Sequence, residues 1–153
     1  INTLREVSEH FNTDLYTTSN TNMLPAIHNK GIADTLTMLP KIYHCSKINL
    51  EITSKTFKSG MTQRLFDIMA SGGFVISNFQ AEIPDFFIPG KDLVLYESIP
   101  DLLEKIYYYL SHEDERLQIA ENGMKKATKY HNYNVRINQM LKAVNDEISN
   151  EFI

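Results

Sequence analysis

Helical segments alternate with short, largely apolar strand-like segments along this sequence, and that alternation restricts the fold more than any other feature. Strands are expected over 14–18, 48–53, 74–77 and 92–96, with room for a short further strand at the end of a loop over 19–33. Helices are expected over 2–11, 40–47, 62–71, 81–87, 100–110, 113–130 and 133–150. This order is typical of parallel strands joined by right-handed helical crossovers. We therefore predict one α/β domain over residues 1–153, a doubly wound parallel sheet with a helical C-terminal tail.

The composition excludes several other classes of protein. The chain carries 15 basic and 19 acidic residues, a net charge of −4, which argues against a nucleic-acid partner. No apolar run approaches the roughly 20 residues of a membrane span, and no secretory signal is visible. A lone cysteine, Cys45, excludes an internal disulfide and favours a cytoplasmic location. We expect Cys45 to be buried, and the scattered histidines predict no metal site.

The strongest candidate site is the joint between the strand ending at Thr53 and the helix beginning near Thr62. The start of a helix offers unpaired backbone N–H groups and the positive end of its dipole, which together attract anions. Glycine permits close backbone approach, and the segment 55–64 holds three basic side chains and no acid. We predict that a diphosphate binds here, to Lys55, Lys58, Ser59, Gly60, Thr62 and Arg64. Asp67, one turn into the helix, is placed to accept hydrogen bonds from a ribose.

A structural interpretation of the same joint stays open. In it, the loop is solvated, a Thr or Ser caps the helix, and Arg64 forms a buried salt bridge with an acid elsewhere in the chain. Gly72 and Gly73 are expected to end the helix rather than to contact a ligand. No nucleophile–base couple, paired carboxylates or phosphate-binding glycine motif is present, so no catalytic residue is assigned. The chain begins at Ile1 rather than Met, which we interpret as a piece of a longer protein.

These segments carry a resemblance to a known family. The stretch 46–53, followed by Ser59-Gly60-Met61-Thr62-Gln63-Arg64-Leu65-Phe66-Asp67-Ile68-Met69-Ala70-Ser71-Gly72-Gly73-Phe74, resembles the C-terminal domain of spore-maturation-type (CgeB-like) glycosyltransferases. More distantly it is similar to group 1 glycosyltransferases of the GT-B fold. Glu82-Ile83-Pro84, Ala120-Glu121-Asn122-Gly123 and His131-Asn132-Tyr133 fit as well. The match extends over nearly the whole chain.

The resemblance implies a Rossmann-like, nucleotide-sugar-binding domain that is paired with an N-terminal acceptor domain in the full enzyme. The carboxylate that holds the donor ribose in such enzymes matches Asp67. A second carboxylate usually stands where this chain has Ser59, so the usual sugar contact departs from the family pattern. These transferases are generally metal-independent, so no cofactor is expected besides the nucleotide-sugar substrate. The acceptor-activating base would lie in the other domain, and the domain alone is expected to be inactive.

Two other functions compete with this one. A flavodoxin-like or receiver-like module that binds a protein partner would share the α/β order, although Asp14, Asp34 and Asp92 do not form a convincing receiver cluster. Half of a GT-B-type sugar-nucleotide epimerase would share the nucleotide site. The sequence leaves the base, sugar, acceptor and stereochemical course undetermined.

Overall fold

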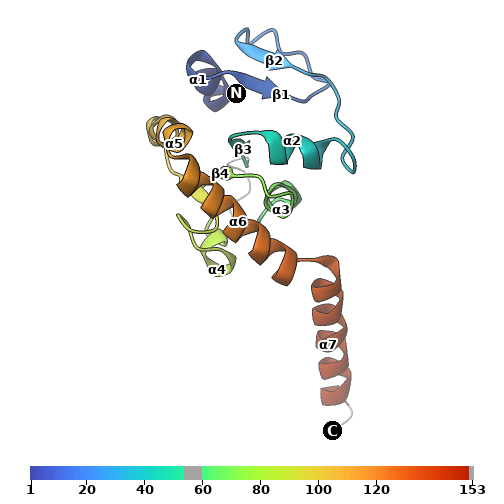
Figure 1. The fold of residues 1–153 in the computed structure, drawn as a ribbon. Helices are drawn as coiled ribbons and strands as arrows, with labels where there is room; N and C mark the ends of the chain where they lie inside the picture. The colour runs from blue at the N-terminus through green and yellow to red at the C-terminus, as the bar shows by residue number, and fades with distance from the viewer. Residues whose placement is uncertain (54–59, 152–153) are drawn as a thin grey trace.

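The computed structural model describes residues 1–53 and 60–151, with side chains described up to residue 146. Its elements follow one another in the predicted alternation (Figure 1). The strands are β1 (Thr13–Leu15), β2 (Ile27–Asn29), β3 (Asn49–Glu51), β4 (Val75–Asn78) and β5 (Val94–Tyr96). The helices are α1 (Asn2–His10), α2 (Leu39–Cys45), α3 (Gln63–Ala70), α4 (Ile83–Phe86), α5 (Ile99–Ser111), α6 (Glu113–Tyr130) and α7 (Tyr133–Glu151).

All described strand pairs are parallel, which confirms the α/β class. The strands form two sheets, β1–β2 and β3–β4–β5, where the sequence suggested one continuous sheet. The short strand expected at the end of the 19–33 loop is β2, and it pairs with β1. The division leaves β3 at the edge of the three-stranded sheet. β4 is therefore the one strand that pairs with β3 among the described residues.

The core lies on both faces of the three-stranded sheet because neighbouring residues of β4 point in opposite directions. Ile76 packs with α5 and α6 residues such as Leu102 and Ile119, whereas Val75 packs with Leu65 of α3. A strand that is apolar on both faces is typical of a sheet covered by helices on both sides. The doubly wound arrangement therefore follows directly from the apolar run at 74–76.

Backbone conformation explains Gly72 and Gly73, and close backbone approach explains Gly123. Gly72 has φ +76° just after α3 ends, and the N–H of Gly73 bonds to the carbonyl of Ile68, so the pair terminates the helix as predicted. Gly123 of α6 lies against the loop before β5, where a Cβ would collide with the backbone oxygen of Asp92. α6 is therefore seated directly on that loop.

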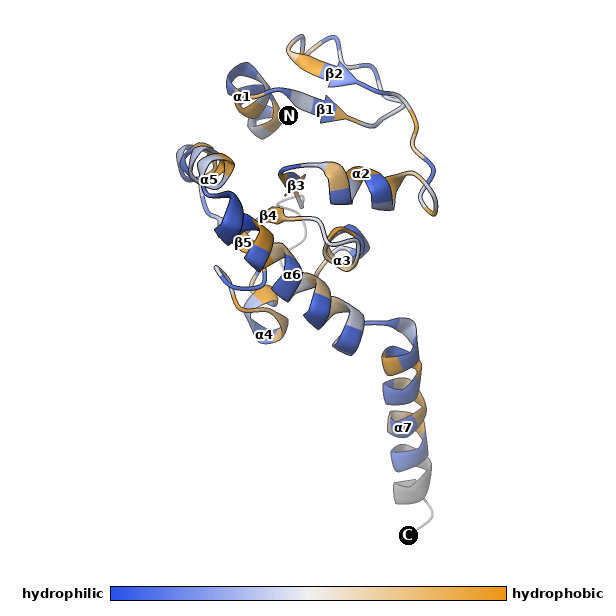
Figure 2. Cartoon of the chain, in the orientation of Figure 1, coloured by the Kyte–Doolittle hydropathy of each residue, from blue (hydrophilic) through white to orange (hydrophobic). Residues whose placement is uncertain are grey.

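Helix α7 extends away from the rest of the chain (Figure 1). An apolar stripe runs along it, visible as orange segments in Figure 2. The stripe consists of Tyr133, Ile137, Met140, Leu141 and Val144, which are 51–77% exposed. Among the described helices, none is both long and apolar enough to cross a membrane.

Cys45, expected to be buried, is exposed. It is the last residue of α2, a helix in which no residue is buried. The expectation failed because a short helix lying on the surface offers its cysteine no apolar environment.

Candidate functional site

The predicted joint forms where β3 ends and α3 begins. Asn78, at the end of β4, accepts a hydrogen bond from the Thr53 N–H at 2.7 Å and so fixes the chain as it leaves β3. Gly60 has φ +96°, a conformation that favours glycine, immediately before the segment that enters the helix. Of the predicted ligands, Gly60, Thr62, Arg64 and Asp67 are described, whereas Lys55, Lys58 and Ser59 lie outside the described residues.

Thr62 is the N-cap of α3. Its Oγ1 accepts a hydrogen bond from the Leu65 N–H at 3.2 Å and donates one to Oε1 of Glu51 at 2.9 Å. Glu51 is the last residue of β3, and its side chain is only 2% exposed. The hydroxyl therefore links the helix to a buried carboxylate on the neighbouring strand.

Arg64 is also drawn toward Glu51. Its Nη1 lies 3.8 Å from Glu51 Oε2, an oxygen with no hydrogen-bond partner among the described residues. The arginine side chain remains 64% exposed, so this ion pair leaves most of the guanidinium accessible. The threonine cap of the structural interpretation is thus present, and Arg64 pairs with a buried acid, but the arginine itself stays largely exposed rather than buried. The question of a bound diphosphate is separate and stays a prediction.

Glu51 was missed by sequence reasoning because the segment 55–64 contains no acid of its own. A signal for it existed, since Glu51 is two residues from Asn49 and so faces the same side of β3. Both residues are buried. Asn49 uses its Nδ2 to donate to the carbonyls of Tyr43 and Phe74 at 2.9 and 3.1 Å. Two polar side chains on one buried face of a strand indicate that each has a hydrogen-bond partner within the protein.

The pKa values of two tyrosines are affected by the charged side chains of this corner. Burial raises the pKa of Tyr43, and nearby Asp67 and Glu51 raise it further while Arg64 opposes them. Burial also raises the pKa of Tyr96, with Glu51 adding to the effect from across the sheet. Of the three charged side chains that act on Tyr43, only Arg64 is basic, and Asp67 and Glu51 are acidic.

Asp67 lies on the wall of a cavity of about 670 Å³ that we name the α3–α7 cavity. The cavity reaches the beginning of α3 at Met61 and Gln63 and is enclosed by α4, the end of α6 and the beginning of α7. Its polar walls are Asp67 of α3, Glu82 just before α4, His131 after α6 and Arg136 of α7. The structure therefore places Asp67 beside a space of the size that small-molecule ligands occupy.

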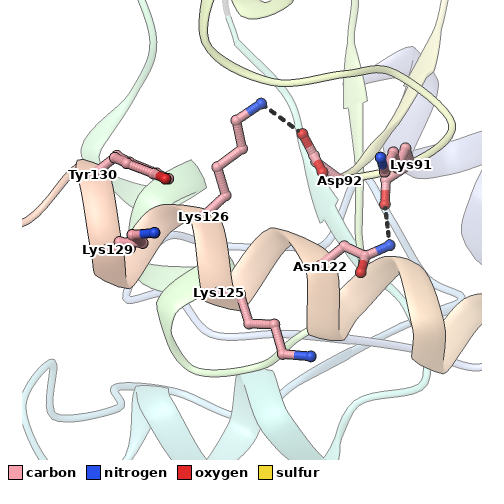
Figure 3. Close-up of a pocket in the computed structure, with 7 residues that line it drawn as sticks. All are labelled: Lys91, Asp92, Asn122, Lys125, Lys126, Lys129 and Tyr130. Atoms are coloured by element: carbon pink, nitrogen blue, oxygen red, sulfur yellow. Dashed lines mark hydrogen bonds and ion pairs between the residues drawn. The ribbon is translucent and has the colours of Figure 1, made fainter.

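A second, shallower pocket of about 270 Å³ is lined by lysines (Figure 3). Its basic residues are Lys91, Lys125, Lys126 and Lys129. Lys126 binds the buried carboxylate of Asp92 at 2.9 Å, and Asn122 donates to the Lys91 carbonyl at 3.1 Å. Asp92 precedes β5, whereas the α3 corner follows β3, so in a parallel sheet this pocket lies at the opposite end of the strands. Its contacts fasten α6 to the loop before β5.

The histidines and the tyrosines of α5 are the remaining candidates from the sequence. Within the described residues, no cluster of His, Cys, Asp or Glu suits a metal ion. His131 is the C-cap residue of α6, and its ring packs against the rings of Phe66, Phe86 and Phe87. Tyr108 donates a hydrogen bond to Glu115 at 2.9 Å and Tyr109 is buried, as in a packed helix flank.

Comparison with known proteins agrees with this architecture. The chain resembles a sucrose-phosphate synthase from Thermosynechococcus elongatus with a TM-score of 0.74 and 13% identity, over 95% of this chain and 41% of the synthase. It also resembles a glycosyltransferase from Rickettsia africae ESF-5 with a TM-score of 0.72 and 14% identity, over 96% of this chain and 44% of the other. At these identities the similarity shows the fold, that of the GT-B glycosyltransferases.

Sequence comparison gives a more direct relationship. An uncharacterized protein from Aquifex aeolicus (strain VF5) is 28% identical over 90 residues, which are 57% of this chain and 22% of that protein. The chain thus spans about a fifth of this curated relative and less than half of each solved structure. The model of a family described as glycosyl transferase-like matches residues 4–142. Since that match takes in most of the sequence, the chain belongs to the glycosyl transferase-like family.

Proposed function

We propose that this chain binds the nucleoside-diphosphate sugar donor of a glycosyltransferase that transfers the sugar to an acceptor held by a second domain. The observation that carries the proposal is the position of Asp67. An exposed carboxylate one turn into α3 borders a cavity that also reaches the first turn of the same helix. Carboxylates are well suited to accept hydrogen bonds from the hydroxyl pair of a ribose.

In this proposal the diphosphate lies at the beginning of α3. Three features favour an anion there: the helix dipole, backbone N–H groups of the first turn, and the exposed guanidinium of Arg64. As the bond between sugar and diphosphate breaks, negative charge grows on the departing phosphate, and preorganised donors stabilise that charge most. Lys55, Lys58 and Ser59 remain proposed ligands by sequence alone.

The nucleoside would occupy the α3–α7 cavity. Its volume of about 670 Å³ lies within the range of roughly 300–1,000 Å³ that is usual for small-molecule sites. No general base is assigned among the described residues, and we place the acceptor and the group that activates it in the second domain because the resemblance to GT-B transferases implies it. We also propose the spore-maturation-type subgroup of the family, on the residues of segment 59–74.

The apolar stripe of α7 supports the existence of that second domain. Five large side chains from Tyr133 to Val144 are more than half exposed on one helix. Contiguous apolar surface of this kind usually marks a protein–protein contact. The solved relatives, more than twice as long as this chain, have room for such a domain.

A panel of nucleotides tests the donor site. We expect UDP, GDP, ADP, CDP or dTDP to bind, as measured by isothermal titration calorimetry. Arg64→Ala should weaken the binding of the nucleoside diphosphate by about 10- to 100-fold, the scale of a charged hydrogen bond. Asp67→Asn should remove the preference for the ribonucleotide over its 2′-deoxy form.

Lys142→Gln is the matched control, because Lys142 is an exposed cation on α7 outside the lining of the cavity. Failure of every nucleotide to bind the wild-type chain would overturn the proposal and favour a protein-binding module. Undiminished affinity in Arg64→Ala would remove the diphosphate from the start of α3.

A further inference from the structure

Arg136 contacts three side chains at the wall of the α3–α7 cavity, where α7 begins. Its Nη2 donates to Nδ1 of His131 at 2.8 Å and its Nη1 donates to Oε1 of Gln139 at 2.9 Å. The guanidinium carbon also lies 5.7 Å from the centre of the Phe86 ring. Three side chains therefore fix the plane of a half-buried guanidinium, so little conformational entropy remains to be lost when a ligand binds.

This arginine lacks an acidic partner in the described part of the chain. Arg64 pairs with Glu51 and Arg116 pairs with Glu113, whereas no described carboxylate forms an ion pair with Arg136. Its observed partners are a neutral amide, an imidazole and an aromatic ring. A half-buried cation that is oriented but not neutralised is a favourable site for an oxyanion, because the ordering that a salt bridge requires is already in place.

His131 explains why Arg136 is oriented in this way. Arginine has only donors, so His131 must accept at Nδ1 and carry its proton at Nε2. The ring centre of His131 lies 5.0 Å from that of Phe87, 5.5 Å from Phe66 and 5.6 Å from Phe86. Burial lowers the pKa of His131, and the nearby charges of Arg136 and Lys126 lower it further. The imidazole is thus kept as a neutral acceptor that positions the guanidinium.

The charges of the cavity are divided between its walls. Asp67 and Glu82 make the α3 and α4 side acidic, while Arg136 makes the α7 side basic. Within the cavity, the carboxylates of Asp67 and Glu82 repel an anion and can accept hydrogen bonds from hydroxyl groups, whereas the guanidinium of Arg136 attracts an anion. A molecule with both kinds of group would therefore lie across the cavity in one orientation.

We infer that Arg136 binds an oxyanion of the phosphate class on the molecule that occupies the α3–α7 cavity, and that His131 is its positioning residue. The inference rests on the proposed function for the choice of ligand. The oxyanion has two sources: a phosphate on the acceptor that reaches this wall, or the diphosphate of the donor, which would then lie at Arg136 instead of at the beginning of α3. The two sources share one chemistry and are separated by experiment.

Calorimetry on Arg136→Gln, with Lys142→Gln as the control, tests the inference. The probes are the nucleoside diphosphate found in the panel above, its parent nucleoside, and inorganic diphosphate. We expect Arg136→Gln to weaken the two diphosphates by at least about tenfold and to leave the nucleoside unchanged. Weakening of inorganic diphosphate alone would assign the oxyanion to the acceptor. If Arg136→Gln and Lys142→Gln bind each probe with the same affinity as one another, the inference is overturned.

The role of His131 has its own readout. His131→Asn keeps an acceptor close to the position of Nδ1 and should retain most of the affinity for inorganic diphosphate, whereas His131→Leu should lose it as Arg136→Gln does. If either variant fails to fold, NMR of the wild-type chain decides the matter. Saturable shifts of the Arg136 Nε–H and His131 ring signals on adding inorganic diphosphate are expected, and their absence would refute the binding role.

If no nucleotide binds but inorganic diphosphate still depends on Arg136, the proposed donor site fails while the oxyanion site stands.

Discussion

Replacing Thr62 with valine should destabilise the fold far more than its position at a loop–helix joint suggests. The substitution keeps the shape of the side chain and removes the hydroxyl, which serves two partners at once. It accepts from the Leu65 N–H and donates to the buried carboxylate of Glu51. Thr62→Val therefore removes a helix cap. It also leaves a buried carboxylate oxygen of Glu51 without its hydrogen-bond donor.

The magnitude follows from these two losses. Loss of an N-cap costs about 1 kcal/mol, and a buried acceptor left without a donor costs about 1–3 kcal/mol. The free energy of unfolding should thus fall by about 2–4 kcal/mol, a large fraction of the roughly 5–15 kcal/mol of a typical domain. The ion pair of Arg64 compensates Glu51 little, because the arginine is mostly exposed and 3.8 Å away.

Urea denaturation followed by circular dichroism measures this loss, with Thr62→Ser as the matched control that retains the hydroxyl. A double-mutant cycle with Glu51→Leu separates the two contributions. In the Glu51→Leu background, Thr62→Val should cost only the cap, so the coupling between the two sites should be about 1–3 kcal/mol. A coupling below about 0.5 kcal/mol, or a Thr62→Val variant as stable as wild type, would refute the reasoning.

Three further predictions concern other parts of the chain. Gly123→Ala should lower the free energy of unfolding by at least about 1–3 kcal/mol in urea titrations, because its Cβ would meet the Asp92 backbone oxygen and lie 3.0 Å from Met69 Cε. Met140→Glu should change that free energy by less than about 0.5 kcal/mol, since Met140 is 68% exposed. For His131, the lowered pKa means that the unfolded chain takes up its proton first, so stability should fall as pH drops below 6.5. The same titration of His131→Gln should show a flatter pH dependence, and an equal slope would contradict the assignment.

Much of the fold could be predicted because apolar periodicity sets it. The run at 74–76 is apolar on both faces, and the structure uses Val75 and Ile76 on opposite sides of the sheet. The Gly72–Gly73 pair ends α3 for the reason given by its sequence, a positive φ after the last turn. The division into two sheets was not predictable, because pairing along a strand edge is made by backbone groups that every residue shares.

The site was predictable only where its residues are neighbours in sequence. The capping role of Thr62 follows from its place before a helical pattern, and the structure confirms it. Glu51 is 11 positions away from Thr62, and only the placement of β3 beside α3 in the fold brings the two together. The same holds for His131, whose aromatic neighbours Phe66 and Phe87 come from other segments. Local sequence patterns cannot specify contacts between distant segments.

Because α7 extends away from the rest of the chain, its helical content should depend on whether a partner covers it. Most helical stability in proteins comes from packing of the apolar side, and the apolar stripe of α7 is exposed. Far-ultraviolet circular dichroism of this chain alone should therefore show fraying over some of the 19 residues of α7. Recovery of that signal on mixing with the proposed second domain would give a label-free titration of their association.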